Sequence, residues 1–250
     1  LFATVLLVTP ANSCHNKRNA FQKPMSREGV NLKLFFLRHG KTEWNLEARY
    51  QGAGGDSPLL PQSYEEIKQA AVYLKQFQFA HVYASPIKRA RDTARTVLAN
   101  LPGQIPLSLV SRLEEFHLGK MDGILFEEAQ ATFPEEFHAF RNAPADYRPV
   151  TIGGESFQEL IDRMTPAIQT IVRAHDTTDQ NVLIVSHGAA LNAEMNALLG
   201  TPLAHLRDRG GLSNTSTTIL ETTDHGASFQ LIEWNKTDYL KRHLDATDTI

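Results

Sequence analysis

The sequence has only one cysteine, Cys14, among its 250 residues. A single thiol cannot form a disulfide within the chain, and it cannot supply the cysteine cluster of a structural zinc site. This composition is typical of proteins in a reducing compartment, so we expect a cytoplasmic protein. A chain of this length can bury a sizeable hydrophobic core without such cross-links.

Neither sign of charge is in excess. The 25 basic side chains and 28 acidic side chains give a formal net charge of -3. This balance argues against a general electrostatic mode of binding to nucleic acid or to an anionic membrane. The apolar run at residues 1–8 is too short to span a bilayer. We therefore expect neither a nucleic-acid partner nor a membrane partner.

The first 29 residues do not resemble the rest of the chain. Residues 15–22 are polar and carry no pattern of a folded element, and Met25 would be a natural first residue for a cytoplasmic protein. We expect residues 1–29 to be a disordered extension or upstream sequence, outside the fold. The alternative is that residues 1–14 are a truncated signal peptide, in which case the protein is exported.

From Asn31 onward, strand-like and helix-like segments alternate without an internal repeat. This order is typical of α/β proteins built from βαβ units. We predict one domain over residues 30–250, with three layers (α/β/α), a mostly parallel central sheet, and a small helical insertion over the carboxyl edge at about residues 120–155. The predicted strands are a first strand ending at Leu37, then residues 80–84, 105–110 and 182–185, then residues 217–221 and 228–234 as a closing hairpin or two further strands.

Serine residues mark the expected starts of three helices. Ser63 and Ser156 each stand three positions before a glutamate, which is the pattern of a capping box. Ser85 followed by Pro86 is a typical N-cap and first helical residue. A fourth helix should follow residue 187 and stop at Gly200. The tail after residue 236 is weakly helical at best.

Two of the predicted strands end in a histidine followed by a glycine, as Arg38-His39-Gly40 and Ser186-His187-Gly188. Parallel strands have their carboxyl ends at one edge of the sheet, where open α/β folds bind ligands. Arg89 follows a third strand, near the start of its helix, where the helix dipole also favours an anion. Guanidinium groups neutralise phosphate oxygens, and imidazole offers a nucleophilic nitrogen. The pattern indicates a pocket for a phosphate dianion.

With several further motifs, these residues resemble the histidine phosphatase superfamily, which includes the cofactor-dependent phosphoglycerate mutases. The resemblance covers most of residues 32–235, and ordered motifs are more specific together than any one alone. The matching pieces are Leu37-Arg38-His39-Gly40 with Thr42, Glu43 and Asn45; Gln51-Gly52 followed by Asp56-Ser57-Pro58-Leu59; Ser85-Pro86 with Arg89-Ala90 and Thr93-Ala94; Leu113 with Glu115 and Gly119; Gly154-Glu155-Ser156; and Ser186-His187-Gly188.

The resemblance implies a role for each residue of one site. His39 is the nucleophile that becomes phosphorylated, and Glu115 protonates the leaving oxygen, with the neighbouring Glu114 as its rival. The phosphoryl group is held by Arg38, Arg89 and His187, Asn45 adds a further contact, and Gln51, Gly52 and Gly188 complete the predicted substrate site. Each residue taken singly also fits a structural role, such as a core histidine or a surface carboxylate. Their shared order and spacing favour catalysis.

The chemistry of phosphoryl transfer agrees with these roles. It depends on positioning and charge stabilisation, and a histidine nucleophile must be neutral, with one nitrogen held as a donor. A carboxyl group that protonates an alkoxide needs a raised pKa. No carboxylate or histidine stands at helical ligand spacing from His187. We predict no metal and no other cofactor.

The surroundings of the predicted acid distinguish a phosphatase from a mutase. Mutases of this family carry Glu-Arg-His-Tyr-Gly there, whereas this chain has Glu115-Phe116-His117-Leu118-Gly119, and no Arg-Arg pair occurs anywhere to bind a substrate carboxylate. A mutase must rebind its phosphorylated intermediate, which requires additional cationic contacts. We therefore expect a phosphomonoesterase that acts on small phosphorylated metabolites. A mutase, a protein-phosphate (phosphohistidine) phosphatase and a non-catalytic phosphate binder are the alternatives, and a homodimer is compatible with the sequence.

Two features bear on specificity. Three residues separate Gly52 from Asp56 where the family commonly has two, which should alter the pocket rim and leave the phosphate site intact. The aromatic residues between Phe126 and Tyr147 either form a specificity wall or simply pack a small helical cap.

Overall fold

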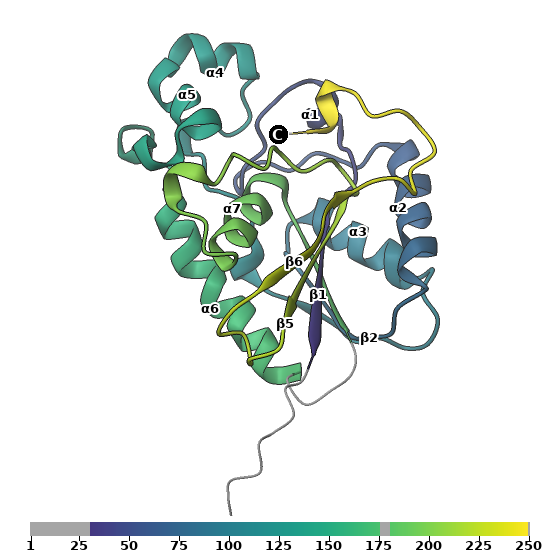
Figure 1. Ribbon diagram of the computed structural model, residues 1–250. Helices are drawn as coiled ribbons and strands as arrows, with labels where there is room; N and C mark the ends of the chain where they lie inside the picture. The colour runs from purple at the N-terminus through teal and green to yellow at the C-terminus, as the bar shows by residue number, and fades with distance from the viewer. Residues whose placement is uncertain (1–30, 176–180, 250) are drawn as a thin grey trace, which may run out of the picture.

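A six-stranded sheet runs through the centre of the computed structural model, which describes residues 31–175 and 181–249 (Figure 1). The strand order is β3-β2-β4-β1-β5-β6, with β1 to β4 parallel, β5 antiparallel to β1, and β6 antiparallel to β5. The mostly parallel sheet is confirmed, and the last two strands form a hairpin. The strands are β1 (Leu32–Arg38), β2 (Phe79–Ala84), β3 (Leu107–Leu109), β4 (Asn181–Ser186), β5 (Thr217–Thr222) and β6 (Gln230–Lys236).

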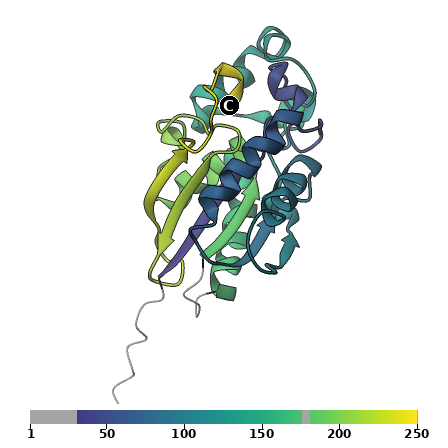
Figure 2. The same cartoon turned by 90° about the vertical axis from the view of Figure 1, so that its right-hand side faces the viewer.

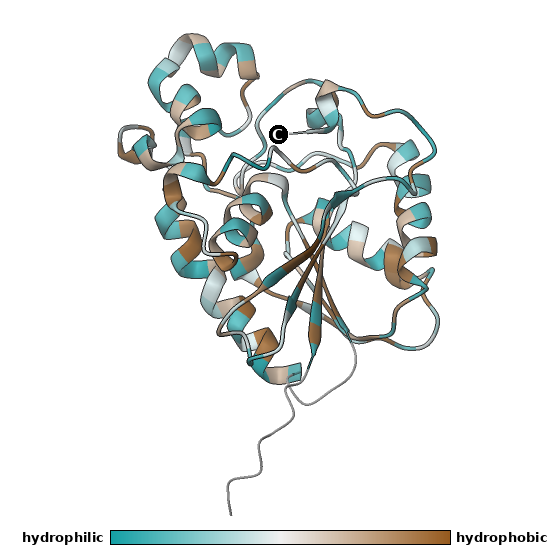
Figure 3. Cartoon of the chain, viewed as in Figure 1, coloured by the Kyte–Doolittle hydropathy of each residue, from teal (hydrophilic) through white to brown (hydrophobic). Residues whose placement is uncertain are grey.

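Helices cover both faces of the sheet, which confirms the three layers (Figures 1 and 2). Successive residues of a strand point to opposite faces, so β1 contributes Leu34 and Phe36 to one core cluster and Phe35 and Leu37 to the other. Figure 3 shows apolar and hydrophilic stretches alternating around these helices, as expected for helices with one buried face. The covering helices are α2 (Pro61–Leu74) and α3 (Lys88–Leu98) on one face, and α6 (Phe157–His175) and α7 (Gly188–Leu198) on the other.

The two central strands, β1 and β4, end at the same edge of the sheet and determine where the residues that follow them lie. β1 and β4 are apolar and buried along almost their whole length, which is typical of parallel strands covered on both faces. Their register pairs Leu37 with Val185 and Arg38 with Ser186. The next residues, His39 and His187, therefore leave the sheet side by side.

A helical insertion lies over the carboxyl edge of the sheet, at the top of Figure 1. Its aromatic rings pack onto the core: the Phe140 ring centroid lies 5.2 Å from Phe116 and 5.5 Å from Phe157. Phe140 also lines the pocket that reaches His39. The aromatic residues thus pack the insertion and form a wall of the pocket. The insertion contains α4 (Phe126–Thr132), α5 (Pro134–Asn142), η3 (Pro144–Asp146) and η4 (Pro149–Ile152).

The predicted helix starts are correct in only one of three places. Ser156 and Glu159 do form a capping box, with the Ser156 amide donating to the Glu159 carboxylate at 2.8 Å. The capping role predicted for Ser63 is wrong, because α2 begins at Pro61 and the Ser63 hydroxyl donates to the Lys41 carbonyl at 2.6 Å. The start predicted at Pro86 is also wrong, since α3 begins at Lys88.

Other predictions need smaller corrections or lie outside the described residues. The strand predicted at residues 105–110 is reduced to β3, and the tail contains only the short η6 (Ala246–Asp248). The predictions for residues 1–29 lie outside the described residues. Within residues 31–175 and 181–249, no helix has both the length and the apolarity needed to cross a membrane.

Glu194 is a fully buried carboxyl group in α7 that receives a hydrogen bond from the Thr165 hydroxyl at 2.9 Å. Burial raises the pKa of Glu194 to about 8. In the unfolded chain the same group ionises near its ordinary pKa of 4.5. The folded state therefore loses stability as the pH rises from about 4.5 to 8, because only the unfolded state releases the proton freely over that range.

We expect Glu194→Gln to stabilise the protein at pH 8, by roughly 2–4 kcal/mol, and to have little effect at pH 4.5. Glutamine keeps an acceptor for Thr165 and carries no ionisable proton. Urea denaturation of both variants at the two pH values measures the difference. A gain of equal size at both pH values would show that packing, and not ionisation, causes it.

Candidate active site

The two histidines that follow β1 and β4 lie together and are almost fully buried. The backbone amide of His39 donates to the Ser186 carbonyl at 3.0 Å, which extends the sheet ladder by one residue. The ring centroids of His39 and His187 are 5.3 Å apart, with the rings inclined by 61°. A cavity of about 20 Å³ reaches His39. The structure thus brings the two predicted histidines together at the carboxyl edge of the sheet.

The His39 ring is held in one tautomer. Its Nδ1 lies 2.8 Å from the Gly40 carbonyl oxygen, which can only accept, so Nδ1 carries the hydrogen and Nε2 carries the lone pair. Arg89 Nε donates to that nitrogen at 3.3 Å. Burial, and then the charges of Arg89 and Arg38, hold the pKa of His39 well below its ordinary value. The imidazole is therefore neutral at neutral pH, with Nε2 able to act as a nucleophile.

Arg38 is completely buried and only partly hydrogen bonded. Its Nη1 donates to the carbonyl oxygens of Leu212 (2.5 Å) and Asp248 (2.7 Å), whereas Nε and Nη2 have no partner among the described residues. A Cβ atom at Gly188 would lie 2.8 Å from Arg38 Nε, so the glycine makes room for the guanidinium group. Burial lowers the pKa of Arg38 to about 10, which leaves it charged at neutral pH. Two buried donors without acceptors indicate a site for an anion.

Arg89 is fixed by the loop that follows Gln51. Its Nη2 donates to the Gly52 carbonyl at 2.8 Å and its Nη1 to the Gly55 carbonyl at 2.7 Å. Gly52 has a φ of +55°, and a Cβ there would lie 1.8 Å from Asp122 Oδ1. The side chain of Gln51 donates to the Thr42 hydroxyl at 2.8 Å. Gln51 and Gly52 both line the pocket, and the loop serves to orient Arg89.

His187 contributes a third buried nitrogen without a partner in the described part of the chain. Its Nε2 lies 2.8 Å from the Ser85 hydroxyl, while Nδ1 is buried without a partner among the described residues. Burial is the main reason why the pKa of His187 lies well below its ordinary value. The serine predicted to cap a helix instead orients this ring. Nδ1 and the two unpaired nitrogens of Arg38 form a set of three buried nitrogens without partners among the described residues.

Glu115 lies at the pocket, whereas its rival Glu114 is not among the lining residues. The Glu115 carboxylate accepts hydrogen bonds from the backbone amides of Ala190 (2.7 Å), Phe116 (3.0 Å) and Ala189 (3.1 Å). Two of these amides belong to the first turn of α7, where the helix dipole favours a negative charge. The contacts fix the position of the carboxylate, and its role as a proton donor stays a prediction.

Asn45 is buried in α1 (Glu43–Leu46), where its side-chain oxygen completes a capping box with Thr42. That oxygen also accepts from Asn214 Nδ2 at 3.3 Å, and Asn214 donates to the His39 carbonyl at the same distance. Asn45 does not line the cavity at His39. Its predicted phosphate contact therefore remains a prediction, and its observed contacts support the loop behind His39.

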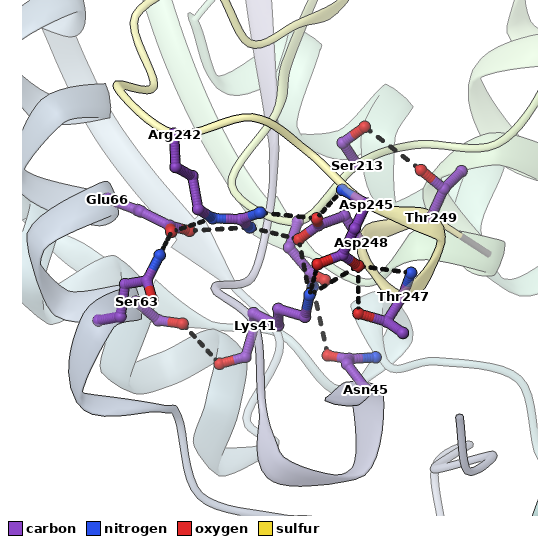
Figure 4. Close-up of polar contacts among 12 residues, drawn as sticks. Lys41, Asn45, Ser63, Glu66, Ser213, Arg242, Asp245, Thr247, Asp248 and Thr249 are labelled. Atoms are coloured by element: carbon purple, nitrogen blue, oxygen red, sulfur yellow. Dashed lines mark hydrogen bonds and ion pairs between the residues drawn. The ribbon is translucent and has the colours of Figure 1, made fainter. Parts of the chain in front are cut away.

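The carboxyl-terminal segment supplies a hydrogen-bond acceptor to Arg38. This contact was not predicted from the sequence. Figure 4 shows a network in which Lys41 and Arg242 surround Asp245 and Asp248. Lys41 Nζ lies 3.2 Å from Asp245 and 3.3 Å from Asp248, and Arg242 binds Asp248. The network fixes the backbone of Asp248, whose carbonyl oxygen receives Nη1 of Arg38. The only sequence signal was the spacing of the two aspartates, which form the capping box of η6.

We expect Asp248→Ala to lower kcat/KM by about tenfold to a hundredfold, because a small displacement of a positioned group is costly. Steady-state kinetics on an aryl phosphate measure the effect, which should appear mainly as a higher KM. Asp238→Ala is the matched control, since Asp238 is exposed and its ion pair within the described ranges is with Lys236. An unchanged KM in a folded Asp248→Ala protein would show that Arg38 keeps its position without the network.

Within the described ranges, no group of three or more histidine, cysteine, aspartate or glutamate side chains is arranged to hold a metal ion. The two unpaired nitrogens of Arg38 are donors, and donors suit an anion.

Comparisons with known proteins agree with the geometry. The family model described as "Histidine phosphatase superfamily (branch 1)" matches residues 34–237. The chain is 35% identical over 189 residues to the glucosyl-3-phosphoglycerate phosphatase of Mycolicibacterium vanbaalenii, covering 74% of this chain and 81% of that protein. It is 30% identical over 210 residues to phosphoglycerate mutase-like protein 4 of Arabidopsis thaliana, covering 84% and 87%. The structure of Bacillus stearothermophilus YhfR superimposes with a TM-score of 0.77 at 34% identity, covering 84% of this chain and all of that one.

Proposed function

The chain belongs to branch 1 of the histidine phosphatase superfamily, and from this membership we propose that it is a metal-independent phosphomonoesterase that works through a phosphohistidine at His39. The observation that carries the proposal is the set of buried, unpaired nitrogens of Arg38 and His187 beside a neutral His39. Buried donors of this kind are costly unless a ligand supplies the acceptors. A phosphoryl group supplies three acceptor oxygens.

In the first step, Nε2 of His39 attacks phosphorus and the bond between phosphorus and the leaving oxygen breaks. Arg89 Nε donates a hydrogen bond to Nε2 before the reaction. When Nε2 attacks, this hydrogen bond breaks and Arg89 donates to an oxygen of the phosphoryl group instead. Arg38, Arg89 and His187 stabilise the charge that spreads over the phosphoryl oxygens. Glu115, when protonated, gives its proton to the leaving oxygen, which departs as an alcohol.

In the second step, water attacks the phosphorus of the phosphohistidine. The carboxylate of Glu115 takes a proton from that water, and the bond between nitrogen and phosphorus breaks. Inorganic phosphate leaves, His39 regains its neutral form, and Glu115 is again protonated. The cycle is balanced without an external acid, base or metal ion. Tyr50, Phe116 and Phe140 line the pocket, which favours a small substrate over a folded protein surface.

The direct test is phosphate release from a generic aryl phosphate in the presence of a chelator. We expect turnover to be unaffected by the chelator, because every group in the two steps belongs to the chain. Activity that disappears with the chelator and returns with added metal would contradict the proposal. The absence of any activity toward aryl and alkyl phosphates, with retained binding of inorganic phosphate, would favour a non-catalytic phosphate binder.

A phosphoglycerate mutase is the second candidate, and one observation favours it. Two arginines outside the phosphate site lie behind rings of the pocket: Arg207 stacks on Phe140, which lines the pocket, and Arg141 stacks on Phe126, which packs against Tyr50. Such cations could retain a second acidic group of a phosphorylated intermediate. Incubation with 3-phosphoglycerate, with and without its bisphosphate activator, separates the two reactions. We expect free phosphate, whereas bisphosphate-dependent formation of 2-phosphoglycerate without phosphate release would identify a mutase.

A further inference from the structure

Two arginines lie on the insertion side of the reactive pocket, outside the site that holds the phosphoryl group. Arg141 belongs to the last turn of α5, and Arg207 follows η5 (Leu203–His205). Together with Asn142, Gly210 and Gly211 they line a cavity of about 190 Å³. Gly210 faces open space, since a Cβ there would meet no atom within 4 Å. The cavity can therefore admit part of a ligand.

Neither arginine has an ion-pair partner within residues 31–175 and 181–249. Arg141 Nη1 and Arg207 Nε are buried atoms without a hydrogen-bond acceptor there. The guanidinium groups lie instead over aromatic rings, with Arg141 5.0 Å from the centroid of Phe126 and Arg207 5.2 Å from that of Phe140. Stacking holds the planes in place without neutralising the charge. Burial lowers the pKa of Arg207 to about 10, and the charge of Glu115 offsets this only in part, so a bound anion would lower the cost of keeping the guanidinium charged.

A third unpaired group connects these arginines to the reactive pocket. The hydroxyl of Tyr50 has no well-formed hydrogen bond among the described residues, and Tyr50 is 2% exposed. Its ring packs on the two rings that carry the arginines: its centroid lies 4.5 Å from that of Phe126, under Arg141, and 6.0 Å from that of Phe140, under Arg207. Burial raises the pKa of Tyr50, whereas the charge of Arg141, its contact with the hydroxyl and the charge of Arg207 oppose the rise. Tyr50 lines the same pocket as His39, as does Phe140, the ring beneath Arg207.

We propose that Arg141, Arg207 and the hydroxyl of Tyr50 form a second anion site, which binds an oxyanion carried by the substrate in addition to the phosphoryl group. Guanidinium groups bind carboxylate and phosphate oxygens in the same forked geometry. The substrate class is therefore a small phosphomonoester with a carboxylate or a second phosphate. This inference rests on the proposed function, because the phosphoryl group must occupy the site at His39 for the second oxyanion to reach the arginines.

The charge around the pocket is opposite in sign to the net charge of the protein. The formal charge of -3 repels an anion with three or more negative charges at long range. Arg38, Arg89, Arg141 and Arg207 reverse that sign locally around one pocket. A substrate with a single phosphoryl group and no other anionic group contacts only Arg38 and Arg89. It should therefore bind more weakly than a substrate that also contacts Arg141 and Arg207.

The test compares three alkyl substrates of similar size: 3-phosphoglycerate, glycerol 3-phosphate, which has a hydroxymethyl group in place of the carboxylate, and 1,3-propanediol bisphosphate. We expect wild-type kcat/KM to be at least about tenfold higher for an oxyanion-bearing substrate than for glycerol 3-phosphate. A preference for the carboxylate or for the bisphosphate identifies the oxyanion. Equal values for all three substrates would overturn the proposal without any variant.

Arg141→Gln and Arg207→Gln each should lower kcat/KM for the preferred substrate by about tenfold to a hundredfold, and change that for p-nitrophenyl phosphate by less than about threefold. Arg207→Lys should recover part of the loss. Arg148→Gln, an exposed arginine of the same insertion whose contacts are backbone carbonyls, is the matched control. Equal losses on both substrates would make the arginines structural and overturn the proposal. If the wild type hydrolyses none of these esters, including p-nitrophenyl phosphate, the proposed function fails instead.

Discussion

His39→Ala is expected to lower the rate of phosphate release by roughly a thousandfold or more, because it removes the nucleophile and not merely a stabilising contact. Among the described residues, His39 is the histidine whose Nδ1 is held by a backbone carbonyl so that Nε2 can attack, whereas His187 contacts the Ser85 hydroxyl through its own Nε2. The measurement is turnover of an aryl phosphate, accompanied by rapid quenching with radiolabelled substrate. Wild-type enzyme should yield a phosphoryl label on His39 that is stable to base and labile to acid.

The matched control is His205→Ala. His205 is exposed and pairs only with Asp208 at 2.9 Å, so its removal should leave turnover and labelling unchanged. Because alanine at residue 39 also removes the hydrogen bond to Gly40, a melting curve should accompany the assay. A folded His39→Ala protein that still turns over, or still takes up the label, would refute the phosphohistidine pathway.

The pH profile adds an independent check on His39. Burial, with the charges of Arg89 and Arg38, places the pKa of this imidazole well below 6.5. Protonation of His39 should therefore not inhibit the enzyme between pH 7 and pH 6, where an ordinary histidine would become half protonated. The contrary result is a loss of kcat/KM centred near pH 6.5 that persists when each of the other histidines is replaced. That result would show that His39 titrates normally.

The sequence was sufficient for the sheet and for the residues at its carboxyl edge, for a physical reason. β1 and β4 are runs of apolar residues that end abruptly in a basic or polar residue, so both their buried character and their end points can be recognised. Parallel pairing then brings His39 and His187 together without any knowledge of the loops.

The errors share a different cause, which is competition from partners distant in sequence. Ser63 and Ser85 have the local pattern of caps, but the Lys41 carbonyl and the His187 ring take their hydroxyls. Arg141 and Arg207 could not be paired from the sequence either, because they come from two separate segments that meet through the packing of α5 against the loop after η5. Local propensity cannot reveal such contacts.

Glu115→Gln is expected to show the second largest effect, and its size should depend on the leaving group. For an alkyl phosphate we expect a loss of roughly a hundredfold to ten-thousandfold, because an alkoxide cannot leave without a proton. For p-nitrophenyl phosphate, whose phenolate leaves readily, the loss in the first step should be less than about tenfold. Glu114→Gln, which changes the adjacent carboxyl group away from the pocket, is the control and should leave both rates unchanged.

The dependence on the leaving group separates chemistry from structure. Glutamine places an amide where one oxygen of Glu115 now accepts from Ala189 or Ala190, so one backbone donor of α7 loses its partner. That loss is present with every substrate, and it would displace the site equally for alkyl and aryl phosphates. Only a proton donor makes the two losses differ. The comparison is made on kcat/KM, which excludes the hydrolysis of the phosphohistidine that both substrates share. Equal losses of kcat/KM on both substrates, in a protein that melts at a lower temperature, would therefore assign Glu115 a positioning role and leave the leaving oxygen to be protonated by another group.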